Sequence, residues 1–138
     1  MNMRTSILLL LLLAAPLGRG VGGEPRISPE YSGITIPPNI APLNFRVTEP
    51  GKAFRVTLRS QAGQPIELTS RTPDIRIPAP RWKELLEHNP GAELRVEIAA
   101  QTAAGQWIQY APILNRIARE PVDSYLAYRQ LGPVYNLY

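Results

Sequence analysis

The side chains in this sequence that could do chemistry are few and lie far apart. His88 is the single histidine, and no Gly-x-Ser-x-Gly segment places a serine where a strand turns into a helix. Since His88 ends a short predicted helix, where a cationic side chain interacts favourably with the helix dipole, we interpret it as a capping residue. The sequence therefore predicts no serine-hydrolase triad.

Carboxylate pairs and cysteines are the next candidates for catalysis. Glu84 and Glu87, and likewise Glu120 and Asp123, have the spacing i, i+3. Such a pair serves a glycosidase only where an apolar cleft raises the pKa of one member, and solvated helix faces explain both pairs more simply. Cysteine is absent, which excludes thiol nucleophiles, zinc thiolates and covalent haem attachment within this chain. We predict a non-catalytic protein with no cofactor and no metal.

One group of aromatic residues suggests a protein partner. Tyr125, Tyr128 and Tyr135 lie with Arg129 outside the alternating segments of the chain, and tyrosine and arginine are enriched at interface hot spots. We predict that these four residues form a docking tail. The alternative is a terminal helix that folds back over an open end of the domain and buries the same tyrosines.

A second aromatic group suggests a different binding function. Trp82, Trp107 and Tyr110 would form a stacking platform if they were exposed side by side, as in carbohydrate-binding modules. The alternative is that they are core aromatics, each with its N–H or O–H bonded at the edge of the core. This group supports the second functional hypothesis, a carbohydrate- or peptide-binding module.

The charge balance gives no indication of a nucleic-acid partner. The chain has 15 basic and 11 acidic residues, a net charge of +4. Removing Arg4 and Arg19 with a predicted leader leaves 13 basic against 11 acidic residues, or +2. The remaining arginines are spread singly rather than clustered with aromatic residues, so we expect no contact with nucleic acid.

The N-terminal residues have the pattern of a secretory signal peptide. Arg4 provides a positive start, residues 7–15 form an apolar run, and Pro16 interrupts it. The run is about half of the roughly 20 apolar residues that span a bilayer, so we expect membrane attachment only if the leader stays uncleaved. We assign residues 1–23 to the leader and predict a periplasmic or secreted location.

Two positions offer the small residues that leader cleavage requires. One is the Ala-Ala-Pro segment at 14–16, and the other is the glycine-rich stretch that ends at Gly23. After export, a chain without cysteine depends on packing alone for its stability, because no disulfide can form.

Alternation of apolar and polar residues dominates the centre of the chain and predicts short strands. In residues 53–59, three apolar side chains face one way and polar ones the other. Connections that contain glycine predict two hairpins. The predicted strands cover residues 45–48, 53–59, 64–70, 75–77, 94–100, 107–111 and 113–118. About six or seven short strands favour an all-β, immunoglobulin-like β-sandwich over residues 45–119.

Three segments complete the predicted domain. One short helix over residues 80–88 starts at a proline and turns Trp82, Leu85 and Leu86 toward the core. The proline-rich residues 24–44 are held extended and lie as a lead-in along the β domain. The aromatic tail, residues 120–138, begins with a second helical turn.

The segments 31–45 and 122–135 resemble a known family. They are similar to the N-terminal region of TolB-like, or PD40, β-propeller proteins of Bacteroidetes and related phyla, sometimes described as cytochrome c biosynthesis proteins. Trp82 and Trp107 also look similar in position. The resemblance implies a β-sandwich lead-in domain, followed in that family by a Cys-x-x-Cys-His segment and a propeller. Neither occurs in this sequence.

For function, the resemblance implies an accessory or interaction module that docks against a protein. The partner would be a downstream propeller region, if this chain is a truncated product, or a separate envelope protein, if the domain works alone. A non-catalytic interaction module is therefore the function we predict.

Overall fold

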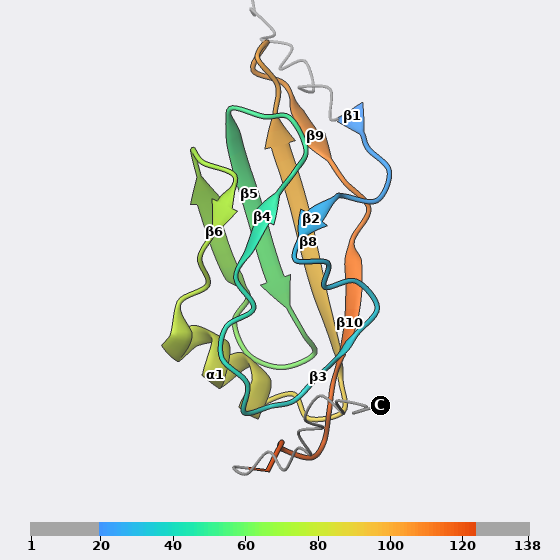
Figure 1. The fold of residues 1–138 in the computed structure, drawn as a ribbon, viewed down its shortest axis with the longest axis vertical. Coiled ribbons are helices and arrows are strands. Elements are labelled where there is room, and N and C mark those ends of the chain that lie inside the picture. Colours follow the sequence, from blue (N-terminus) through green and yellow to red (C-terminus); the bar gives the residue numbers. More distant parts are fainter. Residues whose placement is uncertain (1–19, 124–138) are drawn as a thin grey trace, which may run out of the picture.

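Two β-sheets pack against each other in the computed structural model, which describes residues 20–123 (Figure 1). The larger sheet contains β1 (Gly20–Val21), β3 (Thr35–Ile36), β5 (Ala53–Arg59), β6 (Ile66–Ser70), β8 (Glu93–Gln101), β9 (Trp107–Gln109) and β10 (Ile113–Ile117). The smaller sheet contains β2 (Ile27–Ser28), β4 (Phe45–Val47) and β7 (Asp74–Ile75). With one short helix, α1 (Ala79–Glu87), this architecture confirms the predicted all-β sandwich.

The long strand β8 organises the larger sheet. It pairs with β5 along one edge, and β5 pairs in turn with β6. Along its other edge it pairs first with β10 and then with β9. Pro112 lies between β9 and β10 and has no N–H to donate to β8, so the two short strands replace one continuous strand. The sheet continues beyond them with β1 and β3, which run parallel to β9 and β10 respectively.

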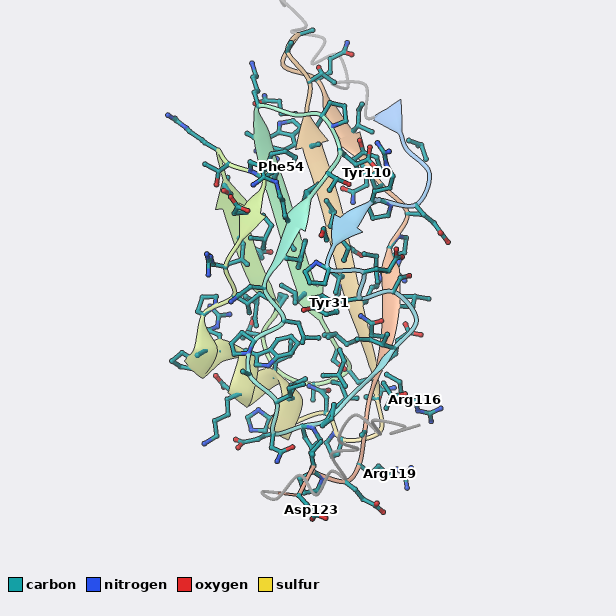
Figure 2. The ribbon with its side chains drawn as sticks, viewed as in Figure 1. Tyr31, Phe54, Tyr110, Arg116, Arg119 and Asp123 are labelled. Atoms are coloured by element: carbon teal, nitrogen blue, oxygen red, sulfur yellow. The ribbon has the colours of Figure 1, made fainter. Side chains whose placement is uncertain are left out.

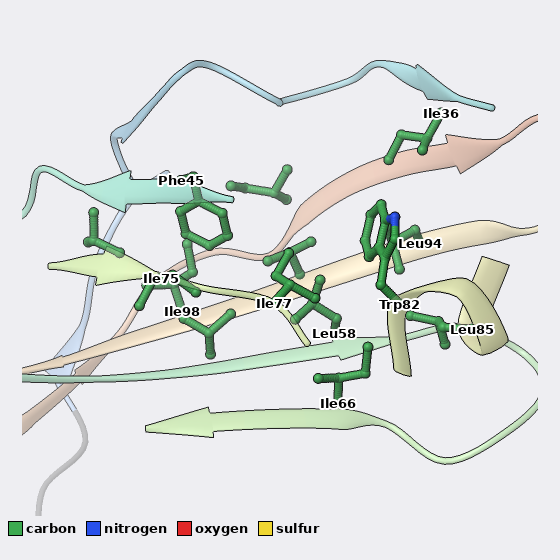
Figure 3. Packing of buried hydrophobic residues seen from close by; sticks show 14 of the residues in the cluster. Ile36, Phe45, Leu58, Ile66, Ile75, Ile77, Trp82, Leu85, Leu94 and Ile98 are labelled. Atoms are coloured by element: carbon green, nitrogen blue, oxygen red, sulfur yellow. The ribbon is translucent and has the colours of Figure 1, made fainter. Parts of the chain in front are cut away.

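The core lies between the sheets and is formed by the predicted alternation. The inward residues of β5 and β8 are nearly inaccessible: Phe54, Val56, Leu58, Leu94, Val96 and Ile98. Helix α1 closes one end of the sandwich, and Trp82 points from it into the core between Ile77 and Leu94 (Figure 3). Leu85 belongs to the same buried cluster. The helix has Pro80 in its first turn, as predicted. None of the helices in the described part of the chain is long and apolar enough to cross a membrane.

The proline-rich lead-in is extended and forms part of both sheets. Its β2 pairs with β4 of the smaller sheet, and its β3 pairs with β10 of the larger one. Between them, Tyr31 lies half-buried against the core where the lead-in crosses the larger sheet (Figure 2). The folded unit therefore extends further toward the N-terminus than the predicted sandwich boundary at residue 45.

Residues assigned to the predicted leader also pair with the sheet. Beyond β1, the backbone N–H of Gly22 donates to the carbonyl of Gln109 at 2.9 Å, and the N–H of Ala111 donates to the carbonyl of Gly23 at 3.0 Å. A Cβ atom on Gly22 would lie 2.6 Å from Cδ1 of Tyr110, closer than side-chain carbons approach one another. A side chain at position 22 would therefore force the Tyr110 ring or the strand to move.

This close approach predicts that alanine lowers the stability of the protein at position 22 but not at position 23. We expect Gly22→Ala to lower the free energy of unfolding by about 1–2 kcal/mol, because the Tyr110 ring or the strand must move. Gly23→Ala is the matched control, since a Cβ there meets no atom within 4 Å. Urea denaturation of both variants and the parent measures the difference. Equal stability of the two variants would show that residues 20–23 do not lie against β9.

Candidate binding surface

The side of the larger sheet that faces away from the core carries a hollow bordered by polar side chains. Arg55 of β5 lies opposite Ala99 of β8, which lies opposite Gln109 of β9. The methyl group of Ala99 leaves space between its longer neighbours. The resulting hollow of about 250 Å³, named here the outer hollow, is lined by Arg55, Thr57, Glu97, Ala99, Trp107 and Gln109.

Arg55 and Trp107 form the central contact of the outer hollow. The guanidinium carbon of Arg55 lies 4.1 Å from the centroid of the Trp107 ring, within the range of a cation–π interaction. Arg55 is exposed and Trp107 is half-buried. Among residues 20–123, no side chain forms an ion pair with Arg55. The indole therefore holds the guanidinium by one face and leaves its N–H groups available.

Glu97, the carboxylate in the outer hollow, is bound by two other arginines. Nη2 of Arg59 and Nε of Arg95 both donate to it, the latter at 2.9 Å. Partial burial raises the pKa of the Glu97 carboxyl, but the two hydrogen bonds outweigh this effect and the pKa lies below its usual value. Arg55, Arg59 and Arg95 face Glu97 and the exposed Glu67, which lies opposite Thr57 on β6, so the hollow and its border carry a net charge of about +1.

The lowered pKa of Glu97 predicts part of the acid sensitivity of the fold. The unfolded chain binds a proton at this carboxyl more readily than the folded chain does, so the stabilising contribution is present above the ordinary glutamate pKa. It is lost as the pH falls from about 4.3 through the lower pKa of the folded state. We expect Glu97→Gln to lose less stability than the parent between pH 5 and pH 3, measured by urea unfolding at each pH. Parallel curves for the two proteins would contradict this assignment.

The three aromatic residues of the predicted stacking platform do not lie together, which corrects that hypothesis. Trp82 is 1 % exposed, and its Nε1–H donates to the carbonyl of Ile40 at 3.0 Å. Tyr110 follows Trp107 by three positions, an odd number, so it faces the other side of the sheet. There its ring packs against Gly22 near the end of the molecule where β1 and β9 meet (Figure 2). Trp107 alone faces the outer hollow.

Tyr110 belongs to the anchor of the lead-in. Burial raises the pKa of its phenol, and the nearby Glu49 carboxylate raises it further. Glu49 accepts hydrogen bonds from the backbone N–H of Arg26 at 2.9 Å and from its Nε at 3.1 Å. The side-chain hydrogen bond, followed by the backbone one, lowers the pKa of Glu49. These groups explain how the N-terminal segment is attached and do not form a ligand site.

The remaining predicted residues fall into two classes. The docking residues Tyr125, Tyr128, Arg129 and Tyr135 lie outside the described residues, as does all but the start of the second predicted helical turn. His88 is exposed at the end of α1, where its backbone N–H donates to the carbonyl of Glu84. The side chain that bonds a carbonyl of the last turn is Asn89, through Nδ2 to Leu85 at 2.8 Å.

The described residues show no constellation for metal binding. Within 20–123, no three histidine, aspartate or glutamate side chains gather as ligands. The carboxylates of Glu84 and Glu87 are exposed on α1, and Glu120 and Asp123 are exposed near the last described residue. The outer hollow is therefore the candidate site, and sequence reasoning missed its central residue, Arg55, although the alternation in residues 53–59 places this arginine on the outer face.

Comparisons with known proteins assign neither a family nor a function to this chain. No protein-family model matches the chain, and no curated protein is similar to it in sequence. The resemblance to the N-terminal region of TolB-like proteins is not supported by these comparisons and stays a prediction.

Proposed function

We propose that this chain is a non-catalytic interaction module, secreted or periplasmic, that binds a protein partner through the outer hollow. The observation that carries the proposal is the exposed Arg55 guanidinium held on the Trp107 ring. Tryptophan and arginine are among the residue types that most often dominate the energetics of protein interfaces. Arg55 lies on β5 and Trp107 on β9, and both strands pair with β8 in the larger sheet, β5 over seven residues. The two side chains are therefore held on a rigid support.

Two further expectations belong to the same proposal. The tail residues Tyr125, Tyr128, Arg129 and Tyr135 are proposed as a second contact with that partner. The partner is proposed to be a separate envelope protein or a propeller region of the TolB-like kind, as the resemblance implies. A stacking platform for neutral sugars is disfavoured, because Trp82 is buried and Arg55 covers the Trp107 ring.

Site-specific photocrosslinking in the producing cell tests whether a protein occupies the outer hollow. A photoreactive phenylalanine derivative replaces Thr57, which lines the hollow, or Arg76, which is exposed between the inward-facing Ile75 and Ile77 on the opposite side of the sandwich. We expect a discrete protein adduct from position 57 that disappears when Arg55→Gln is added, and none from position 76. Equal adducts from both positions, or none from either, would contradict the proposal.

Export would require a processing step that keeps the N-terminal strand. The pairing of residues 20–23 with β9 and Ala111 supports cleavage at or before Gly20 and argues against cleavage after Gly23. Of the two candidate positions, the small residues at 14–16 are therefore favoured. N-terminal sequencing of the protein recovered outside the cytoplasm tests this, and a mature chain that begins at Glu24 would contradict it.

A further inference from the structure

We infer that the outer hollow binds a carboxylate carried by an acidic, extended segment of the protein partner. This inference rests on the proposed function and names the chemistry that the hollow recognises. It follows from the charge around the hollow, the orientation of Arg55 and the state of the Trp107 ring.

The charge of the hollow favours an anion. The carboxylate already present, that of Glu97, is engaged by Arg59 and Arg95 on its two oxygen atoms. The negative charge of Glu97 is therefore balanced by these two arginines, whereas Arg55 has no carboxylate partner among residues 20–123. An incoming anion can bind to Arg55. Positive charge in excess on a concave surface attracts and orients an acidic partner.

The orientation of Arg55 favours a planar, bidentate acceptor. A guanidinium group stacks through its faces and donates hydrogen bonds through its edges, so both interactions can form at once. The Trp107 ring covers one face of the Arg55 guanidinium group, with its centroid 4.1 Å from the guanidinium carbon. This contact restricts the Arg55 side chain before any ligand binds. Thr57 lines the same hollow, and a threonine hydroxyl can donate a further hydrogen bond. A carboxylate fits these donors better than a neutral hydroxyl or amide does.

The Trp107 ring decides between a protein and a glycan as the source of the carboxylate. A sugar ring, acidic or neutral, needs a bare aromatic face to stack on, whereas Arg55 covers the face of Trp107 in this structure. A glutamate or aspartate side chain needs no such face and reaches the Arg55 edge from an extended backbone. On an extended strand, alternate side chains point to one side about 7 Å apart, a spacing that suits successive contacts along a sheet face.

A binding assay with a defined acidic peptide tests the inference. The probe is a fluorescein-labelled peptide of about ten residues in which glutamate and serine alternate, and the readout is fluorescence anisotropy at low ionic strength with the full processed chain. We expect saturable binding that weakens as salt is added. Arg55→Gln should weaken binding roughly tenfold, and Arg55→Lys, which keeps the charge but loses the planar fork, by a smaller factor.

Two variants separate the outer hollow from general charge attraction. Arg76→Gln removes the same charge from the opposite side of the sandwich and should leave the affinity unchanged. Glu97→Gln releases Arg59 and Arg95 from their shared carboxylate and should tighten peptide binding. Since Arg55 and Arg76 are both exposed, circular dichroism should show that these two variants fold like the parent.

The outcomes that overturn the inference are distinct from those that overturn the proposed function. Equal weakening by Arg55→Gln and Arg76→Gln would mean diffuse attraction without a site. Tighter, Arg55-dependent binding of oligogalacturonate than of the peptide would assign the hollow to an acidic glycan. No peptide binding, together with an Arg55-dependent adduct from position 57, would reject the carboxylate and keep the interaction module. No binding and no adduct would reject both.

Discussion

Replacing Trp82 with alanine is expected to lower the free energy of unfolding by about 3–5 kcal/mol, the largest effect of any substitution considered for this protein. The indole is 1 % exposed and fills the space between α1 and the two sheets (Figure 3). Its Nε1–H also donates to the carbonyl of Ile40 in the lead-in. Alanine would therefore leave both a cavity in a core that lacks disulfides and a lead-in carbonyl without its donor.

The other tryptophan provides a matched control for this experiment. Trp107 is half-buried on the outer face, and Trp107→Ala removes a surface contact with Arg55 rather than a part of the core. We expect it to cost about 1 kcal/mol or less. Urea denaturation followed by far-ultraviolet circular dichroism allows the comparison, because the backbone contributes most of that signal and the transition midpoint can be read for both variants. A Trp82→Ala variant as stable as Trp107→Ala would contradict the burial of Trp82.

Local sequence patterns were sufficient to predict the helix and the strands from β4 to β10. Alternation in residues 53–59 and 94–100 identifies both the strands and the face that each side chain occupies, because the side-chain period of a strand is two. The spacing of Trp82, Leu85 and Leu86 similarly identifies the buried face of α1, and all three residues are buried. In these segments the interaction that determines the structure is visible within a few residues of sequence.

The strands of the lead-in could not be predicted in the same way. β1, β2 and β3 have two residues each, too few to show any period. Their existence depends on partners far away in the sequence: β9 for β1, β4 for β2 and β10 for β3. The sequence predicted an extended segment along the β domain, and the choice of partners came from the sheet edges that the rest of the domain leaves open.

The candidate site shows the same division between local and distant information. The alternation of β5 places Arg55 on the outer face, but its contact with Trp107 also requires that β8 lie between β5 and β9 in one particular register. The same register brings Arg59 and Arg95 to one Glu97. The odd spacing of Trp107 and Tyr110 along one strand is enough to place them on opposite faces of the sheet. The stacking platform could therefore have been rejected from the sequence.

The attachment of the lead-in depends most directly on one buried amide, which leads to the second prediction of large effect. Asn115 of β10 is 6 % exposed. Its Nδ2 donates to the carbonyl of Tyr31 at 2.8 Å, and its Oδ1 accepts from the N–H of Ile34 at 3.0 Å. Leucine at this position has nearly the same size but no polar atom, so two partly buried backbone groups of the lead-in would lose their partners.

Asn115→Leu is therefore expected to lower the free energy of unfolding by about 2–4 kcal/mol, since each unsatisfied buried group costs about 1–3 kcal/mol. Asn39→Leu is the control, because Asn39 makes the same pair of hydrogen bonds, to the N–H and carbonyl of Val122, on an exposed surface where water can replace them. We expect this control to cost much less in urea denaturation. Hydrogen exchange should also show faster exchange of the Ile34 amide in Asn115→Leu, whereas equal costs for the two leucine variants would mean that Asn115 does not hold the lead-in.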